Sequence, residues 1–405
     1  MNTTSSSRAL DVPSTREGFL TELARLEAAF AKMQPLVELT VRDPALDCEG
    51  YVVVWNTLEP GGIAKGGTRV TPTVSLDEIK MLARTMALKN AAAGLPLGGA
   101  KSGVRADPWA HDIKARYQAI TKRFACLFPV HGGALGGLGY DIGARPEFCE
   151  WFIEATEMPQ RFTGKTRARG GTDYDVEGIA GLGVAVAARE ALAHAGKSAQ
   201  GARFAVQGLG AMGAGVVRYF AGFGGRLIAL ADPVVGGSWT LPDSLKDDAH
   251  EDLVARIAAR DYANLRPILD RHGKLEKEPD AVLFTAADVL FPSARQDVIS
   301  TRNADRIQAR MLSEGANGPC SSDARERLHA RGVTVLPDFL ANPGGIIAAY
   351  VEMTSQSADK VAEAKAMTER VIAGNVRGVL DVAKSLDVAP AQAAMFLALR
   401  RVVGA

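Results

Sequence analysis

Hydrophobic and polar positions divide the chain into regions with different patterns. Residues 35–175 hold short strand-like runs, such as 51–55, between glycine-rich loops. Residues 185–340 alternate apolar strands with helical segments, which is typical of a parallel α/β sheet. The spacing of apolar positions also predicts helices at 16–34, 346–356, 358–384 and 389–402. We therefore expect an α/β fold with two domains around a cleft: an N-terminal mixed-sheet α/β domain and a doubly wound Rossmann-like nucleotide domain.

A glycine-rich turn joins the first strand of the second region, at 203–207, to an expected helix. The first glycine of the turn allows a tight bend, the second lets the backbone approach a pyrophosphate, and the third lets helix pack on strand. The helix N-terminus offers N–H groups and a positive dipole end to phosphate. We expect a dinucleotide cofactor here, the alternative being a purely structural turn. The residues expected to contact the cofactor are Gly208, Gly210, Ala211, Met212 and Gly213.

An acidic residue, Asp232, ends the next expected strand at 227–231. A carboxylate at this point accepts hydrogen bonds from a ribose 2′-hydroxyl and repels a 2′-phosphate. We therefore expect NAD rather than NADP as the cofactor. The alternative is a turn aspartate ahead of Pro233.

Composition and charge exclude several classes of partner. The chain has 405 residues, of which 47% are hydrophobic and 23% charged, so it can bury a large core. Its net charge of +1 gives no basic field, and no apolar stretch is long enough to span a bilayer, so we expect neither a nucleic-acid nor a membrane partner. Residues 1–14 lack the apolar block of a signal peptide, and we expect a cytoplasmic protein.

Cysteine and histidine usage gives no indication of a metal site. The four cysteines are dispersed without a CxxC pair, and we expect them to be buried, reduced thiols. The six histidines show no metal-binding spacing. We therefore expect no metal.

Three lysines lie in or beside glycine-rich loops of the first region. Lys65 and Lys101 are flanked by glycines, and Lys89 lies near the end of a helix expected to begin after Ser75. An acid, Asp141, follows in a further glycine-bearing loop. Each lysine alone fits a solvated surface position, but apolar neighbours indicate a partly dry cleft. Burial and a neighbouring ammonium lower the pKa of a lysine there and make its amine a usable base.

The order of these motifs resembles that of the glutamate/leucine/phenylalanine/valine dehydrogenase superfamily, and most closely its glutamate dehydrogenase branch. The resemblance covers roughly residues 35–355, and it includes Asp141 at the position of the family's catalytic aspartate. The matching segments are 65–69 (KGGTR), 89–101 (KN…LPLGGAK), 163–172 (TGK…GGT), 314–319 (EGANGP) and 337–345 (PDFLANPGG).

The resemblance implies an NAD(P)-dependent amino-acid dehydrogenase and assigns roles by position. It implies that Lys101 activates water, that Asp141 carries the proton to and from the amino group, and that Lys89 holds the substrate α-carboxylate. Gly98, Gly99 and Asn342 would help to orient that end, while Lys65 and Thr163 would reach the far end of the substrate side chain. The other implied contacts are Ala349 for the substrate and Thr172, Asn317 and Asn342 for the cofactor.

The resemblance also implies a domain plan and an assembly. Residues 17–180 are expected to form the substrate-binding and oligomerisation domain, with C-terminal helices 357–405 packing back on it. Residues 181–356 are expected to form the NAD(P)-binding Rossmann-like domain. The expected partners are small molecules (an amino acid, a 2-oxo acid and ammonium) and further copies of the chain in a homo-oligomer, a hexamer by resemblance.

The sequence departs from the family at the substrate side chain. Glutamate-specific members place a serine hydroxyl at the position of Ala349, whereas members that act on apolar amino acids also lose the first lysine. Lys65 is retained, and an unpaired buried ammonium is unfavourable, so we expect L-glutamate as substrate. Apolar or unusual amino acids, as in leucine, phenylalanine or valine dehydrogenases, are the alternative.

A second departure concerns the cofactor. The family usually has a threonine at the position of Ala180, where it contacts the nicotinamide amide. The loop at 132–137 also carries more glycine than is typical. These changes leave a weakly active regulatory paralogue as a further alternative.

Overall fold

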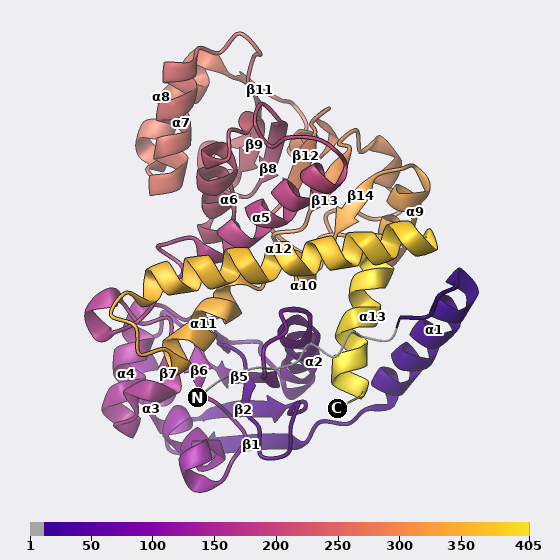
Figure 1. The fold of residues 1–405 in the computed structure, drawn as a ribbon. Coiled ribbons are helices and arrows are strands. Elements are labelled where there is room, and N and C mark those ends of the chain that lie inside the picture. Colours follow the sequence, from indigo (N-terminus) through magenta and orange to yellow (C-terminus); the bar gives the residue numbers. More distant parts are fainter. Residues whose placement is uncertain (1–11, 405) are drawn as a thin grey trace.

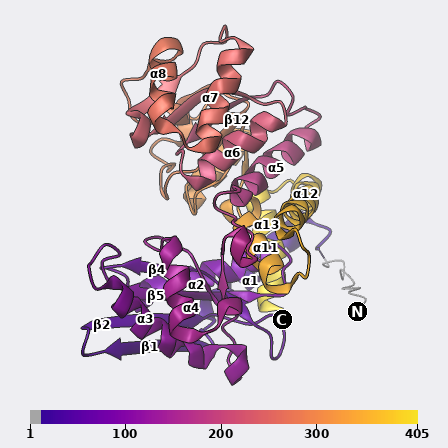
Figure 2. The ribbon, with the colours of Figure 1, turned by 90° about the vertical axis from the view of Figure 1, so that its left-hand side faces the viewer.

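The computed structural model describes residues 12–404 and arranges them as two α/β units, each built on its own sheet (Figure 1). The expectation for the N-terminal segment 1–14 falls mostly outside the described residues. Figure 2 shows the two sheets in separate lobes, with the C-terminal helices beside the junction between them. This is the predicted α/β class with two units.

The first sheet is mixed and has five strands. β1 and β2 form an antiparallel hairpin, β2 pairs antiparallel with β5, and β3 and β4 run parallel to β5. The strands are β1 (Val37–Asp43), β2 (Cys48–Val54), β3 (Ala64–Lys65), β4 (Thr68–Thr71) and β5 (Gly98–Arg105). The valines of β2 fit a pleated, buried surface, as predicted for 51–55. Lys101 lies in the middle of β5, opposite Val53.

Helices cover both faces of this sheet. α2 (Leu76–Ala92) begins at Ser75, whose hydroxyl accepts the N–H of Glu78 at 3.2 Å, as the predicted start requires. It packs on β5. α3 (Ile113–Phe124) covers the opposite face, where Gly50 has no side chain to collide with Ile120. The other helices of this unit are α1 (Arg16–Lys32) and α4 (Pro146–Thr156).

The second sheet has seven strands in the order β11-β10-β9-β8-β12-β13-β14. The five strands from β9 to β14 are parallel, and the chain winds outward on both sides of β8, as predicted for a doubly wound sheet. The pair β10–β11 adds an antiparallel edge that the pattern did not predict. The strands are β8 (Arg203–Gln207), β9 (Arg226–Asp232), β10 (Gly237–Thr240), β11 (Lys274–Leu275), β12 (Val289–Pro292), β13 (Met311–Ser313) and β14 (Thr334–Leu336).

Both faces of the parallel part are buried. Phe204 and Val206 of β8 enter one apolar cluster, whereas Ala205 enters another, so alternate side chains serve opposite faces. The helices of this unit are α5 (Ile179–His194), α6 (Ala211–Gly222), α7 (Asp247–Ala259), α8 (Tyr262–His272) and α9 (Ser322–Ala330).

The C-terminal helices contact both units. α12 packs along α5 of the second unit, whereas α13 packs against α1 and α2 of the first. The apolar stripe of the amphipathic α12 lies against the more uniformly apolar α5, so the C-terminal helices bridge the two units, and the division of the chain into domains stays a prediction. The helices after β14 are α10 (Asp338–Ala341), α11 (Gly344–Thr354), α12 (Lys360–Leu386) and α13 (Pro390–Val403).

Three further features bear on membrane insertion, metal binding and the state of the cysteines. Among residues 12–404, no single helix has the length and apolar composition of a membrane span, although the bent pair α12–α13 meets such a test when taken together. In the same part of the chain, no three His, Cys, Asp or Glu side chains are grouped as metal ligands. Cys48, Cys149 and Cys320 are buried free thiols, but Cys126 is exposed, because it follows α3 in a surface turn.

Candidate active site

Lys101 and Asp141 lie side by side in the first unit. The side chain of Lys101 is only 7% exposed, and its Nζ lies 3.1 Å from Oδ1 of Asp141. Asp141 follows the short strand β6 (Leu138–Gly139), which pairs with β7 (Phe162–Thr163). A lysine and a carboxylate at this distance in a nearly dry environment can exchange a proton with a bound reactant.

Arg69 completes this cluster. Its Nε donates to Oδ2 of Asp141 at 2.9 Å, and a second guanidinium nitrogen donates to Glu78 at 2.5 Å. Burial raises the pKa of Asp141, but the charges of Lys101 and Arg69 outweigh burial and hold that pKa below its usual value. Asp141 is therefore a carboxylate at neutral pH. Sequence reasoning assigned no role to Arg69, although the residue closes the motif that contains Lys65.

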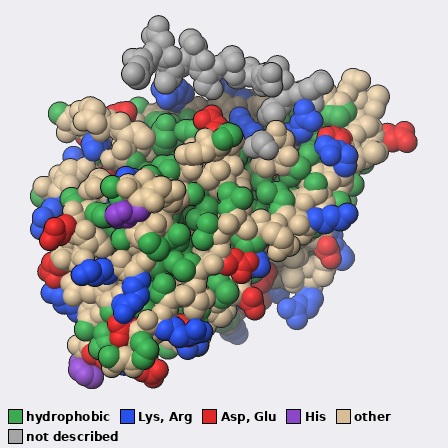
Figure 3. Space-filling model, turned by 90° about the horizontal axis from the view of Figure 1, so that it is seen from below, with side chains coloured by type: hydrophobic (Ala, Val, Ile, Leu, Met, Phe, Trp, Pro, Cys, Tyr) green, Lys and Arg blue, Asp and Glu red, His purple; other side chains and the backbone are tan. Residues whose placement is uncertain are grey.

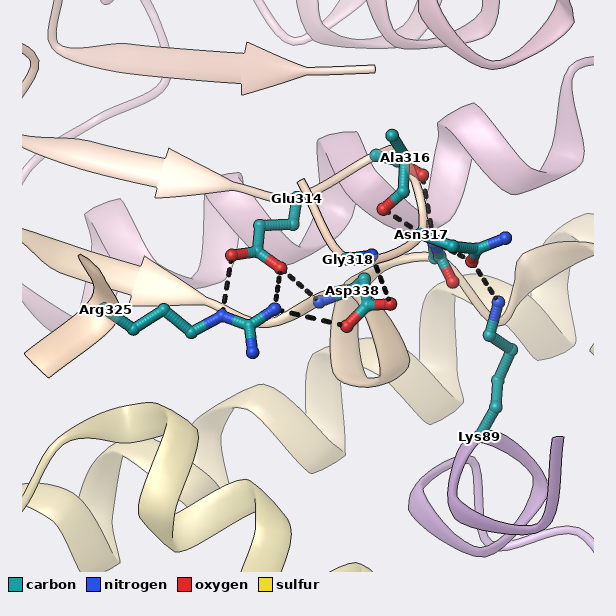
Figure 4. A network of polar contacts seen from close by, with 9 residues as sticks. Lys89, Glu314, Ala316, Asn317, Gly318, Arg325 and Asp338 are labelled. Carbon is teal, nitrogen blue, oxygen red and sulfur yellow. Dashed lines mark hydrogen bonds and ion pairs between the residues drawn. The ribbon is translucent and has the colours of Figure 1, made fainter. Parts of the chain in front are cut away.

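Lys89 reaches from the first unit to the second. It lies in the last turn of α2, and its Nζ donates to Oδ1 of Asn317 at 2.8 Å (Figure 4). Asn317 lies in the loop after β13. Burial lowers the pKa of Lys89 to about 8, although the side chain is only half-buried in the structure. The structure thus places two residues that were predicted for substrate and cofactor in direct contact.

Lys65 is the most enclosed of the three lysines. It is 1% exposed, and its Nζ donates to the carbonyl oxygens of Leu138 at 2.7 Å and Gly66 at 3.3 Å. Among the described residues, these two carbonyl oxygens are the hydrogen-bond partners of the Lys65 ammonium. Burial lowers its pKa to about 7, with Glu352 acting in the opposite direction. An ammonium has three donors, so one donor is left for a further acceptor.

The polar atoms around Lys65 include the hydroxyl of Thr163, and the role expected of this pair toward the substrate side chain stays a prediction. The Thr163 hydroxyl donates to the same Leu138 carbonyl at 3.3 Å. A Cβ added to Gly139 would lie 3.0 Å from Oγ1 of Thr163 and 3.3 Å from Nζ of Lys65, so both atoms border that glycine. Ala349 is buried in α11 and brings no hydrogen-bonding group. The hydrogen-bonding groups next to the Lys65 ammonium therefore come from the first unit.

Gly98 and Gly99 serve the packing of β5. A Cβ at Gly98 would lie 1.8 Å from the carbonyl oxygen of Asn56, and one at Gly99 would lie 2.3 Å from the backbone nitrogen of Ala87 in α2. Their N–H groups donate to Ile63 and to Asn56. Neighbouring backbone therefore occupies the space beside both α-carbons, and the orienting role expected of these glycines toward the substrate carboxylate stays a prediction.

The glycine-rich turn at 208–213, which we call the fingerprint loop, has the geometry that each glycine was expected to provide. Gly208 has φ +90°, and a Cβ there would lie 2.7 Å from Cα of Ala294. A Cβ at Gly213 would lie 1.8 Å from the Gly208 carbonyl oxygen, so helix and strand pack closely. Gly210 faces open space, and α6 starts there without a side-chain cap. An open backbone at an uncapped helix start fits the pyrophosphate of a dinucleotide.

Two predicted cofactor residues have partners within the protein. Oδ2 of Asp232 accepts the N–H of Leu209 at 2.7 Å, and Oδ1 accepts that of Val234 at 2.9 Å. Asp232 therefore holds the fingerprint loop, and each oxygen keeps a lone pair for another donor. The N–H and hydroxyl of Thr172 both donate to Glu352 at 3.1 Å.

Asn342 presents an acceptor without a partner. Its Nδ2 donates to the Gly315 carbonyl at 2.9 Å and to Oδ1 of Asn317 at 3.1 Å. Its own Oδ1 is buried and has no hydrogen-bond partner among the described residues. An unsatisfied buried acceptor is unfavourable, so this oxygen suits a donor on a ligand, such as an ammonium or a carboxamide.

Sequence reasoning missed Glu352, a buried carboxylate that contacts the segment 164–172. Its side chain is 1% exposed and accepts from the backbone of Gly164 and from Nζ of Lys165 at 2.5 Å, in addition to Thr172. A glutamate inside the apolar run of α11 was the available signal, because a buried charge needs partners. Glu352 ties α11 to the segment that carries Thr163.

Family models match most of the chain. The family described as Glutamate/Leucine/Phenylalanine/Valine dehydrogenase matches residues 170–405, and the Glu/Leu/Phe/Val dehydrogenase, dimerisation domain matches residues 38–158. Together they span both units and all the predicted site residues except Thr163.

Individual proteins similar to this chain are glutamate dehydrogenases. The chain is 33% identical to a glutamate dehydrogenase of Aeropyrum pernix over 72% of this chain and 68% of the relative. It is 31% identical to an NADP-specific glutamate dehydrogenase of Saccharolobus shibatae over the same shares. Among solved structures, a hetero-hexameric glutamate dehydrogenase from Thermus thermophilus, in its Leu-bound form, superposes with a TM-score of 0.75 at 27% identity, covering 95% of both chains.

Proposed function

Because the chain belongs to the glutamate/leucine/phenylalanine/valine dehydrogenase family and is an amino-acid dehydrogenase, we propose that it catalyses the reversible, NAD-dependent oxidative deamination of L-glutamate. In this reaction L-glutamate, NAD+ and water give 2-oxoglutarate, ammonium, NADH and a proton. The observation that carries the proposal is the pair of Lys101 and Asp141, 3.1 Å apart, in the unit that also carries Lys65 and Lys89.

The roles of this pair follow from its chemistry. When bound, the nicotinamide accepts or supplies the hydride at the substrate α-carbon. Oδ1 of Asp141 takes a proton from the substrate ammonium before hydride transfer and returns it to the amino group as that group departs. Nζ of Lys101 takes the proton from the water that attacks the iminium carbon. Arg69 keeps Asp141 ionised between these transfers. Lys89 holds the α-carboxylate through a charge-assisted hydrogen bond.

The case for glutamate rests on Lys65. Two of its donors are used by backbone carbonyls, which orient the ammonium without neutralising it. A substrate carboxylate at the third donor supplies the missing negative charge in a dry site, where such a pair is strong. Thr163 lies next to this position.

One observation favours a second candidate. Ala349 is 3% exposed and offers no hydroxyl to a side-chain carboxylate. A buried methyl group at this point favours a longer or apolar side chain, as in a leucine, phenylalanine or valine dehydrogenase. The lowered pKa of Lys65, at about 7, makes a neutral amine accessible there, which an apolar substrate would tolerate.

The cofactor assignment is part of the proposal. Gly210, Ala211 and Met212 would hold the pyrophosphate at the start of α6, and Asp232 would accept a hydrogen bond from a ribose hydroxyl. NAD is preferred because a 2′-phosphate would meet the charge of Asp232. Asn342 and Asn317 lie on the side of the second unit that faces Lys89.

We also propose a homo-oligomer, by resemblance a hexamer. β1 is the edge of the first sheet, and its alternating Val37, Leu39 and Val41 are only half-buried in the single chain. An edge strand presents unpaired N–H and C=O groups to which a strand of another chain can add. Figure 3 shows hydrophobic side chains gathered on the face of the molecule seen from below Figure 1.

A coupled assay tests the substrate and cofactor together. The absorbance of reduced nicotinamide is followed with ammonium and a panel of 2-oxo acids, once with NADH and once with NADPH. The proposal expects the highest kcat/KM with 2-oxoglutarate and NADH. Highest turnover with 2-oxo-4-methylpentanoate favours the second candidate, a clear NADPH preference overturns the role of Asp232, and no turnover at all indicates a non-catalytic paralogue.

A further inference from the structure

Three charged side chains meet in the second unit, behind the loop that carries Asn317 (Figure 4). Arg325 of α9 donates from Nε and from a terminal nitrogen to the two oxygens of Glu314, at 2.8 and 2.5 Å. The same terminal nitrogen lies 3.5 Å from Oδ1 of Asp338, the first residue of α10. The side chains are 15%, 0% and 10% exposed for Arg325, Glu314 and Asp338. We call these three residues the acid–arginine cluster.

The two carboxylates fix both ends of the loop at 314–318. Glu314 starts the loop, and its Oε2 accepts the N–H of Asp338 at 3.0 Å. Oδ2 of Asp338 accepts the N–H of Gly318, at the other end, also at 3.0 Å. Gly318 turns the chain with φ +57°. The loop between these anchors therefore has little freedom.

Asn317 lies next to the second anchor, and its side chain connects the units. Its Oδ1 accepts from Asn342 at 3.1 Å and from Nζ of Lys89 at 2.8 Å. A continuous path of hydrogen bonds thus runs from Arg325 through Asp338, the loop and Asn317 to the first unit. Each step is at or below 3.5 Å.

We propose that the acid–arginine cluster is a positioning device for Lys89: it holds Asn317 where it orients the ammonium for the substrate α-carboxylate. The inference rests on the proposed function for the role of Lys89 and extends it to residues that act through Asn317. Arg325 is a positioning residue, because its guanidinium contacts the two carboxylates rather than Lys89.

The cluster also acts on Lys89 through charge. Burial lowers the pKa of Lys89, Asp338 raises it, Lys101 lowers it and Asp141 raises it. These are the charged groups that face Lys89 from α10, β5 and the loop after β6. Loss of the Asp338 charge should therefore lower the pKa of Lys89 further, without any change at the reaction centre itself.

The first experiment reads Lys89 directly in the full-length protein. Its reactivity toward limiting acetic anhydride is measured by mass spectrometry across a pH series, for wild type and for Asp338→Asn. Asparagine keeps an oxygen for the Gly318 N–H, and it removes the charge together with the weak acceptor that faces Arg325 at 3.5 Å. We expect the titration of Lys89 to move to lower pH by about half a unit or more. The matched control is Asp305→Asn, which removes a charge of the same sign from an exposed pair with Arg327.

The second experiment reads positioning through kinetics. Arg325→Lys keeps the charge but loses the two-pronged contact with Glu314. The KM for the 2-oxo acid should rise about fivefold or more while kcat changes much less, because ground-state orientation of the carboxylate is lost. If this variant does not fold, the double variant Glu314→Gln/Arg325→Met removes the buried Glu314–Arg325 pair and leaves Asp338 bonded to the Gly318 N–H, and it should show the same KM increase.

Each outcome decides the proposal. It is overturned if folded Asp338→Asn gives the wild-type titration of Lys89, or if the Arg325 variants keep the wild-type KM. It is supported if both readouts move and Asp305→Asn moves neither. Absence of turnover in the wild type itself would contradict the proposed function, while the Lys89 titration would still decide the coupling to Asp338.

Discussion

Asp141 lies between two cations: its Oδ1 is 3.1 Å from Nζ of Lys101, and its Oδ2 is 2.9 Å from Nε of Arg69. The arrangement separates two tasks. Lys101 faces the reaction that we propose, whereas Arg69 is held on its other side by Glu78 and keeps the carboxylate charged. The dehydrogenase chemistry thus depends on a carboxylate whose protonation is set by its neighbours.

Replacement of Arg69 by Met should therefore change the pH dependence of the reaction. Burial raises the pKa of Asp141, and the two cations outweigh it. With one cation gone, the pKa of Asp141 rises, so less carboxylate is present at mildly acidic pH. The acidic limb of the kcat/KM profile should move to higher pH. A profile that superimposes on the wild type would contradict this role, and Arg42→Met, in an exposed pair with Glu49, is the control.

Lys65 should make stability depend on pH. Its pKa falls to about 7 in the folded protein, from the ordinary lysine value of 10.5 in the unfolded chain. Between these values the unfolded chain binds more protons, so the unfavourable burial of this charge is relieved as the pH rises. Below pH 7 both states carry the proton and the full unfavourable contribution remains.

The comparison with Lys65→Met isolates this effect. The free energy of unfolding of wild type relative to the variant should rise by up to about 1.4 kcal/mol per pH unit above pH 7. Urea unfolding at several pH values between about 7 and 9 measures it. Lys114→Met, in an exposed pair with Glu154, should show no such trend. A difference for Lys65→Met that stays constant with pH would refute the argument.

Introduction of a hydroxyl at Ala349 should sharpen the choice of substrate. Ala349→Ser offers a hydrogen bond to a side-chain carboxylate, worth about 1.5 kcal/mol when the acceptor is charged, or roughly tenfold in kcat/KM. The ratio of kcat/KM for 2-oxoglutarate to that for 2-oxo-4-methylpentanoate should increase. Ala348→Ser, one position earlier in α11, controls for the added hydroxyl. An unchanged or lower ratio would show that position 349 does not face the substrate.

Much of the second unit could be predicted because its signals are local. β8, the glycines at 208–213 and the start of α6 follow one another directly in the sequence, and each glycine has the conformation or clearance that the pattern required. The pair β10–β11 was missed because its strands are short and separated by two helices. Edge strands of this kind depend on non-local pairing, which periodicity does not encode.

The candidate site likewise contains residues that local sequence marked and contacts that only the folded chain creates. Lys65, Lys89 and Lys101 were found because glycines and order along the chain marked them. The contact of Lys89 with Asn317 joins two units, and the partners of Asp141 and Glu352 depend on folding in three dimensions. Gly98 and Gly99 show the converse, since a glycine next to a reactive lysine reflects close backbone packing as readily as room for a ligand.

The central claim is that Lys101 performs the chemistry, and Lys101→Met tests it most directly. Oxidation of NADH in the presence of ammonium and 2-oxoglutarate is compared for wild type, Lys101→Met and the surface control Lys114→Met, with circular dichroism confirming that all three are folded. We expect Lys101→Met to lose a factor of about 10² to 10⁴ in kcat, the usual contribution of a general base, while the control stays near wild type. A folded Lys101→Met protein that keeps wild-type turnover would contradict the account.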